Sequence, residues 1–210
     1  MEPLAKKILL VRHGATAYNE ADLLQGRIDN PLSPRGRAEA ERLAERLRGE
    51  AIDAVFSSPL RRALETAEII NRFHGREIVQ VPEFSEIDLG EWEGLSYGRV
   101  KELYAEAHQR WLDDPDTPVP GGESFRAVCE RVRPGLERAL ADGHAAILIS
   151  GHASANRAIL AGLLGLAPAQ ARAFRSGNAA LSRLVLYAGN GRRRAALDFW
   201  NSTSHLDPGP

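Results

Sequence analysis

Cysteine and long hydrophobic runs are both scarce in this sequence. Cys129 is its only cysteine, which excludes an internal disulfide and the secreted domains that depend on one. The apolar neighbours Val128 and Val132 have helical spacing, so we expect a buried structural thiol rather than a reactive one. Four strongly apolar residues follow the opening MEPLAKK, too few for a signal-peptide core or a membrane span. We therefore expect a cytoplasmic protein without a membrane partner.

An excess of charge of one sign is also missing, because 27 basic side chains are balanced by 28 acidic ones. Nothing in this balance favours binding to nucleic acid or to an anionic membrane, so any anion binding must be local. Common metal-ligand spacings are absent as well, since no two of the six histidines lie four residues apart. This absence argues against a metallohydrolase.

What the sequence does contain is a regular alternation of apolar strands and amphipathic helices. Its 210 residues suit one domain with a full core, and no change of composition marks a boundary, so we interpret residues 1–210 as a single domain. The alternation predicts an α/β fold, a three-layer sandwich with helices on both faces of a mostly parallel central sheet. Strands are expected at 8–11, 52–56, 78–81, 145–149, 182–187 and 195–199, and helices at 34–47, 60–70, 100–111, 125–140 and 155–164.

The first strand stops abruptly at Arg12, His13 and Gly14. In open α/β sheets, ligands bind at the carboxyl ends of the strands, where this triplet falls. The three residues suit phosphoryl transfer: an imidazole can attack phosphorus, a guanidinium matches phosphate oxygens, and glycine lets the backbone approach closely. The strand at 145–149 likewise runs into His152. If the two strands are neighbours, both histidines face one phosphate.

Two further segments can complete such a site. The helix expected after Ser58 and Pro59 presents Arg61 and Arg62 in its first turn, near a positive dipole end, and helical phase does not choose between them. The acidic loop 82–95 can supply a proton donor, but composition does not rank its carboxylates. These are Glu83, Glu86, Asp88, Glu91 and Glu93. The Pro/Gly-rich segment 113–122 is interpreted as a linker or flexible flap.

Five segments in fixed order closely resemble the histidine phosphatase superfamily, in its phosphoglycerate-mutase-like branch. The resemblance covers nearly the whole chain, and the order and spacing of the segments make it specific. The segments are LVRHGATAYN, SSPLRRALETA, FSEIDLGEWEGL, PGGES and ISGHASANRAI.

The resemblance implies a role for each candidate residue. His13 is the nucleophile that accepts a phosphoryl group, and Glu86 is the acid that then activates water. Neither a cofactor nor a metal is implied, and Ala153 and Tyr18 stand where glycine and tryptophan are frequent in the family. The implied phosphate pocket consists of Arg12, Arg62 and His152 with His13, and the implied substrate contacts are Asn19, Gln25, Gly26 and the position of Ala153.

The resemblance alone leaves the reaction open between a phosphatase and a cofactor-dependent phosphoglycerate mutase. Mutases carry a tyrosine-glycine, leucine-glutamine-glycine run after the acid, and this chain has GEWEGLSYGRVKELY instead, together with glutamine-glycine where mutases usually have threonine-glycine. Both differences favour a phosphatase acting on a small phosphorylated metabolite, whose identity stays open. A non-catalytic phosphate-binding module is the third alternative, and a homodimer is allowed. Arg27, Ile28, Phe84, Trp92 and Trp111 either shape the entrance or pack in the core.

Overall fold

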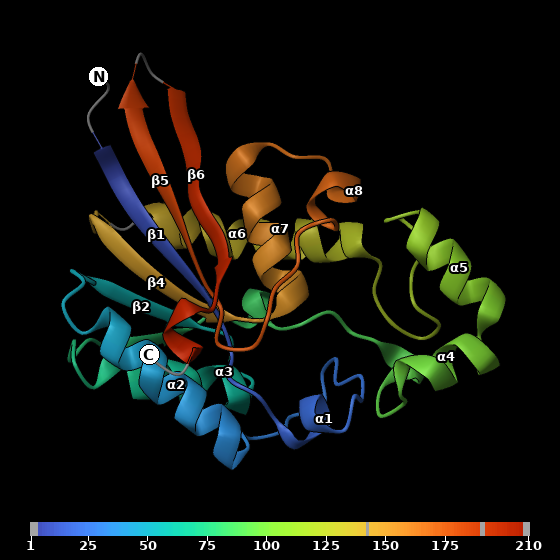
Figure 1. The fold of residues 1–210 in the computed structure, drawn as a ribbon. Helices are drawn as coiled ribbons and strands as arrows, with labels where there is room; N and C mark the ends of the chain where they lie inside the picture. The colour runs from blue at the N-terminus through green and yellow to red at the C-terminus, as the bar shows by residue number, and fades with distance from the viewer. Residues whose placement is uncertain (1–3, 142, 190–191, 208–210) are drawn as a thin grey trace.

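The computed structural model describes residues 4–141, 143–189 and 192–207, and it has a six-stranded sheet at its centre (Figure 1). The strand order is β3-β2-β4-β1-β5-β6. The first four of these strands are parallel, and β5 and β6 are antiparallel additions at one edge. The predicted α/β sandwich with a mostly parallel sheet is therefore confirmed. The strands are β1 (Leu4–Arg12), β2 (Ala54–Ser57), β3 (Ile78–Gln80), β4 (Ala146–Gly151), β5 (Leu181–Gly189) and β6 (Arg192–Ser202).

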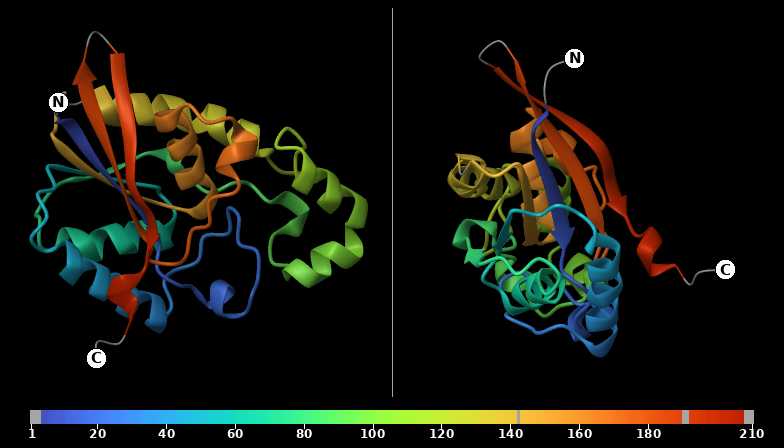
Figure 2. Two further views of the ribbon diagram at one scale, coloured as in Figure 1. Left: turned by 45° about the horizontal axis from the view of Figure 1, so that its top comes forward. Right: turned by 90° about the vertical axis from the view of Figure 1, so that its left-hand side faces the viewer.

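Helices cover both faces of this sheet. Successive side chains of β1 point to opposite faces and therefore contribute to two separate cores. Ile8 and Leu10 face a core shared with α6 (Phe125–Ala141) and α7 (Ala153–Leu164). Leu9 and Val11 face a second core shared with α2 (Pro34–Leu47) and α3 (Arg61–Asn71). The right-hand view of Figure 2 shows α2 and α6 on opposite sides of the sheet. All four of these β1 side chains are at most 2% exposed, which explains why the strand reads as an unbroken apolar run.

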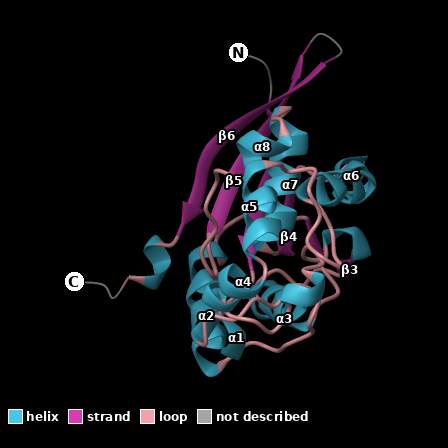
Figure 3. Cartoon of the chain, turned by 90° about the vertical axis from the view of Figure 1, so that its right-hand side faces the viewer, coloured by secondary structure: helices cyan, strands magenta, loops and turns pink. Residues whose placement is uncertain are grey.

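The remaining elements are short, and several of them lie near the carboxyl edge of the sheet. In Figure 3 this side faces the viewer, with α4 and α5 in front of β4. They are α1 (Ala17–Glu20), η1 (Pro82–Phe84), η2 (Gly90–Trp92), α4 (Tyr97–Leu103), α5 (Ala105–Asp113), α8 (Pro168–Ala171) and η3 (Ser204–Leu206). Within the described part of the chain, no helix is long and apolar enough to cross a membrane.

The prediction of a single helix over 100–111 is wrong, because α4 and α5 are separate helices. Tyr104 breaks them with φ −128° and ψ 36°, outside the helical region. The break lets three rings surround the buried Trp92, with centroids 6.4 Å away for Tyr104, 5.9 Å for His108 and 5.6 Å for Trp111. Aromatic packing therefore outweighs the helical period at this point.

Three smaller expectations also need correction. The helix expected from residue 60 with Ser58 as its cap starts at Arg61 instead, with Leu60 at the N-cap and no capping side chain. Cys129 is half-buried rather than buried, although burial still raises the pKa of its thiol to about 11, which keeps it protonated and unreactive. Segment 113–122 is packed against the acidic loop: a Cβ on Gly122 would lie 2.4 Å from the Asp88 carbonyl oxygen.

Candidate active site

His13 directly follows β1 and is 2% exposed. Its backbone N–H donates to the carbonyl of Gly151 at the end of β4 (3.0 Å), so the sheet itself fixes the residue. Its ring Nδ1 lies 2.7 Å from the carbonyl oxygen of Gly14. A carbonyl only accepts, so Nδ1 carries the proton and Nε2 keeps a lone pair. The backbone therefore presets the tautomer that a nucleophilic histidine needs.

His152 is brought beside His13 because β1 and β4 are adjacent, with Arg12 paired to Gly151. The two imidazole centroids are 5.2 Å apart, and His152 is fully buried. Its Nε2 lies 2.8 Å from the Ser58 hydroxyl, which also accepts from the Leu60 amide. Its Nδ1 is buried and has no hydrogen-bond partner among the described residues. Ser58, interpreted from the sequence as a helix cap, thus orients His152, a role that no local pattern signals.

Arg12 and Arg62 line the same cavity as His13, and backbone carbonyls hold each guanidinium. Arg12 Nη1 donates to the Ser176 carbonyl at 2.5 Å. Arg62 Nη1 and Nη2 donate to the carbonyls of Ile28 and Gly26, both at 2.8 Å. The Nε atom of each arginine is buried without a hydrogen-bond partner in the described structure. The backbone therefore holds both guanidinium groups, while the Nε donor of each has no partner in the described structure.

The structure also separates Arg62 from Arg61, which helical phase does not distinguish. Arg62 is 1% exposed, whereas Arg61 is on the surface, 3.8 Å from Glu65. The loop after β1 decides the difference, because its two carbonyls accept from Arg62 and so compensate for burial of the charge.

A cavity of about 210 Å³ is lined by Arg12, His13 and Arg62, whereas His152 is not among its lining residues. Glu86 lines it, and its carboxylate accepts from the backbone N–H groups of Ile87 (2.9 Å) and Ser154 (3.1 Å). Ser154 lies in the first turn of α7, whose dipole favours a negative charge there. A larger hollow of about 460 Å³, around Cys129 and Gly162, contains neither histidine. The active-site cavity is lined by Arg12, His13, Asn19, Leu23, Leu24, Gln25, Gly26, Arg62, Glu86, Ile87, Leu89, Trp111, Ala153 and Ser154.

The residues expected to contact substrate all line this cavity. The amide oxygen of Asn19 accepts from the Thr16 backbone N–H at 3.1 Å and from the Asn178 side chain at 3.1 Å. Its amide N–H₂ is therefore the end suited to an anion. Gln25 accepts from the Thr16 hydroxyl at 2.9 Å. Gly26 has φ +51°, and a Cβ there would lie 2.0 Å from a Glu93 carboxylate oxygen, so glycine is required at this rim.

Of the residues considered for the entrance, only Trp111 lines the cavity. Phe84 and Trp92 belong to the core, with exposures of 0% and 2%. Arg27 contacts the backbone of Glu86 instead. The described residues contain no group of three or more His, Cys, Asp or Glu side chains arranged to hold a metal ion.

Burial and positive charge keep both histidines neutral. Desolvation lowers the pKa of His13 well below 6.5, and the charges of Arg12 and Arg62 lower it further. The same causes lower the pKa of His152, with His13 itself contributing. Burial also lowers the pKa of Arg12, to about 10, although the Glu86 carboxylate opposes this change. At neutral pH the site therefore combines two neutral imidazoles with two cations.

These pKa shifts predict that the phosphate-free protein loses stability as pH falls below 6.5. Unfolded histidines take up protons there, whereas His13 and His152 resist protonation in the folded state, so the unfolded state binds more protons. Each histidine contributes a slope of up to about 1.4 kcal/mol per pH unit. The measurement is the free energy of unfolding between pH 6.5 and 5, compared with a His13→Asn/His152→Asn variant. Identical pH profiles for the two proteins would contradict the shifts.

The chain is similar to known proteins over most of its length. The model of the histidine phosphatase superfamily (branch 1) matches residues 8–201. Phosphoserine phosphatase 1 of Hydrogenobacter thermophilus is 33% identical over 202 residues, which are 95% of this chain and 94% of that protein. The probable phosphoglycerate mutase GpmB of Proteus mirabilis is 33% identical over 181 residues, covering 85% and 84%.

A solved structure matches the fold as well. The mycobacterial glucosyl-3-phosphoglycerate phosphatase, solved in complex with VO3, superimposes with a TM-score of 0.87 at 30% identity and covers 94% of this chain and all (100%) of that one. The family match spans β1 to β6 and so includes every residue of the cavity described above. The chain belongs to the histidine phosphatase superfamily, branch 1.

Proposed function

We propose that this protein hydrolyses small phosphomonoesters through a phosphohistidine on His13. The observation that carries the proposal is a set of three buried nitrogens without hydrogen-bond partners in the described structure: Arg12 Nε, Arg62 Nε and His152 Nδ1. Buried donors without partners are costly. A phosphate bound at His13 is placed to accept from the Arg12 and Arg62 donors, which belong to the same cavity, and from His152, whose ring lies beside that of His13. The Ser58 hydroxyl, which accepts from the Leu60 amide, can donate to Nε2 of His152, and in that tautomer Nδ1 carries the proton and can donate as well.

In the first step, the lone pair on Nε2 of His13 attacks phosphorus. The P–N bond forms as the bond from phosphorus to the leaving oxygen breaks, and Glu86 donates a proton to that oxygen. Arg12, Arg62 and His152 stabilise the charge on the equatorial oxygens of the transferring group. Because His13 is already neutral and correctly protonated at Nδ1, no proton has to leave the nucleophile before attack.

In the second step, a water molecule takes the place of the departed alcohol. The Glu86 carboxylate removes a proton from that water, whose oxygen attacks phosphorus while the P–N bond breaks. The electron pair returns to Nε2 of His13, and inorganic phosphate leaves. Glu86 is protonated again, so the enzyme returns to its starting state. The same carboxylate thus serves as acid and then as base.

Hydrolysis, rather than isomerisation by a mutase, is supported by the residues after the acid and by the phosphatase names of relatives. We expect the protein to release phosphate from 3-phosphoglycerate and phosphoserine and to form little 2-phosphoglycerate. The measurement follows free phosphate and both phosphoglycerate isomers in one reaction. Rapid interconversion of the isomers with little phosphate release would establish the mutase instead. Activity abolished by a chelator and restored by zinc would favour a metallohydrolase.

A further inference from the structure

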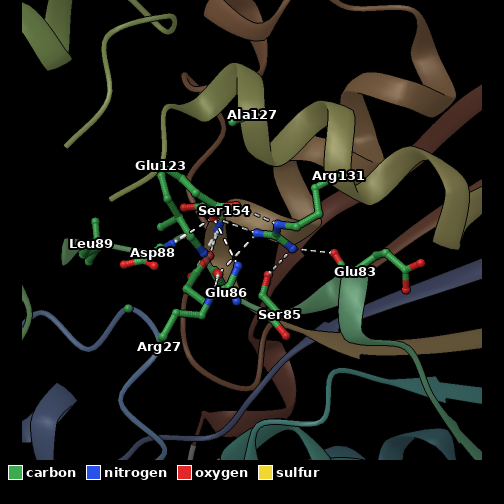
Figure 4. A network of polar contacts seen from close by, with 12 residues as sticks. Arg27, Glu83, Ser85, Glu86, Asp88, Leu89, Glu123, Ala127, Arg131 and Ser154 are labelled. Atoms are coloured by element: carbon green, nitrogen blue, oxygen red, sulfur yellow. Dashed lines mark hydrogen bonds and ion pairs between the residues drawn. The ribbon is translucent and has the colours of Figure 1, made fainter. Parts of the chain in front are cut away.

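The loop that carries Glu86 is held by an arginine from another element, which the catalytic proposal does not use. Arg131 extends from α6 onto this loop, as Figure 4 shows. Its Nη1 donates to the carbonyls of Glu83 (2.7 Å) and Ser85 (3.1 Å), and its Nη2 donates to the carbonyl of Glu86 at 3.3 Å. One guanidinium therefore binds three carbonyls within four consecutive residues and fixes the course of the backbone there.

Two further side chains complete the clamp. Glu123 accepts from Arg131 Nε at 2.8 Å and Nη2 at 3.0 Å, so it holds the planar guanidinium at two points. Glu123 also accepts from the Asp88 backbone N–H at 3.0 Å. Arg27, in the loop between α1 and α2, donates through Nε to the Glu86 carbonyl at 2.8 Å. Residues from two distant parts of the chain, Arg27 and the segment that holds Glu123 and Arg131, thus converge on the backbone around Glu86.

The charges and hydrogen bonds of this network also favour the ionised form of Glu123. Burial by itself would raise the pKa of Glu123, but hydrogen bonds from Arg131 and Asp88 and the charges of Arg131 and Arg27 lower it overall. The side chains of Arg131 and Glu123 are about one-fifth exposed, at 21% and 20%. A buried ion pair is weak evidence for net stability. Here the pair of Arg131 with Glu123 holds the guanidinium in one geometry against the loop carbonyls.

We infer that Arg131, supported by Glu123 and Arg27, is a positioning residue for proton transfer by Glu86. The clamp fixes the backbone of Glu86, and the Ser154 amide holds its carboxylate at 3.1 Å. The carboxylate therefore reaches the cavity in one orientation, without searching among rotamers during catalysis. The inference rests on the proposed function, since it assigns Arg131 an effect that acts only through Glu86.

The test compares two substrates that differ in their need for a proton. An alkyl phosphate such as phosphoserine has a poor leaving group, whereas 2,4-dinitrophenyl phosphate needs no acid. We expect Arg131→Gln to lower kcat/KM for the alkyl phosphate by about 10- to 100-fold. For the dinitrophenyl ester, kcat/KM should change by less than about threefold. This quantity reports only the steps up to the first phosphoryl transfer, and for this ester that transfer needs no acid. Arg131→Lys should lower kcat/KM as Arg131→Gln does, since lysine keeps the positive charge but lacks the planar guanidinium that binds several carbonyls at once.

Arg138→Gln is the matched control. Arg138 lies on the same helix and pairs with the Glu83 side chain at 2.6 Å, but it is 59% exposed and binds no backbone of the acid-bearing loop. It should leave kcat/KM unchanged for both substrates. Thermal unfolding of each variant shows whether the fold is intact. If Arg131→Gln does not fold, Arg27→Gln is the alternative variant, because the Arg27 side chain is 38% exposed. It should also lower kcat/KM more for the alkyl phosphate than for the dinitrophenyl ester, by a smaller factor than Arg131→Gln.

Two results would overturn the inference. One is an equal loss on both substrates in a folded Arg131→Gln or Arg27→Gln protein. The other is a full effect of Arg131→Gln in a Glu86→Gln background, where a residue acting through Glu86 has nothing left to position. If Glu86→Gln alone lowers kcat/KM equally for both substrates, Glu86 is not the acid of the proposed function, and the inference is rejected with it.

Discussion

His13→Asn is expected to lower kcat/KM for every phosphomonoester by about 10,000-fold or more, because the nucleophile is removed from a unit that acts together. Asparagine removes the nucleophile and can keep one of its hydrogen bonds. Its side-chain N–H₂ can still donate to the Gly14 carbonyl, which His13 binds at 2.7 Å, so the loop keeps its contact while the lone pair is lost. Hydrolysis is measured by phosphate release from phosphoserine and from 2,4-dinitrophenyl phosphate.

The same variant tests for the covalent intermediate. Wild-type protein quenched during turnover of a radiolabelled phosphomonoester should carry label that survives alkali and is lost in acid, as expected for a phosphohistidine. His13→Asn should carry none. His74→Asn is the control, because His74 lies in the turn after α3 and outside the cavity. Equal residual phosphate release from His13→Asn and wild type would favour a non-catalytic phosphate-binding module instead.

Glu86→Gln is expected to lower kcat/KM for alkyl phosphates by about 100- to 10,000-fold, the range that general acid catalysis contributes. Glutamine keeps the shape of the side chain and an oxygen that can accept from the Ser154 amide, so the first turn of α7 stays capped. What is lost is the proton for the leaving oxygen. The loss should be much smaller for 2,4-dinitrophenyl phosphate, whose leaving group departs as an anion.

A second measurement on Glu86→Gln separates the roles of acid and base. With 2,4-dinitrophenyl phosphate, transfer to His13 stays fast while attack by water slows, because no carboxylate removes its proton. A burst of one equivalent of dinitrophenolate should therefore precede a slow steady rate. Equal losses for alkyl and dinitrophenyl esters, with no burst, would show that another group transfers the proton.

Several features of this fold follow from local sequence. The run from Ile8 to Val11 is apolar at every position because β1 is covered on both faces, and this pattern needs no partner to be recognised. The start of α2 at Pro34 follows from Ser33, whose hydroxyl accepts from the Gly36 amide at 3.1 Å. The division between α4 and α5 was missed, because it depends on rings that gather around Trp92 from distant positions.

The candidate site divides in the same way. Arg12 and His13 could be proposed from their place after a buried strand. The choice of Arg62 over Arg61 needed either the family resemblance or the loop carbonyls that accept from Arg62 in the folded chain. The contact of Ser58 with His152 and that of Arg131 with the Glu86 backbone form only in the folded chain. Neither residue has a local signal, since each acts across 45 residues or more.

By itself, the sequence determined which chemical groups are available and roughly where each strand delivers them: a histidine after each of two apolar strands, arginines in a helix start, and carboxylates in a loop. Only the tertiary structure decided which of them meet. The pairing of β1 with β4 places His13 and His152 with ring centroids 5.2 Å apart, and packing of α6 on the acidic loop brings Arg131 onto the Glu86 backbone. The physical reason is that residue type and local period are encoded within a few positions, whereas strand order and helix packing follow from burying the whole core.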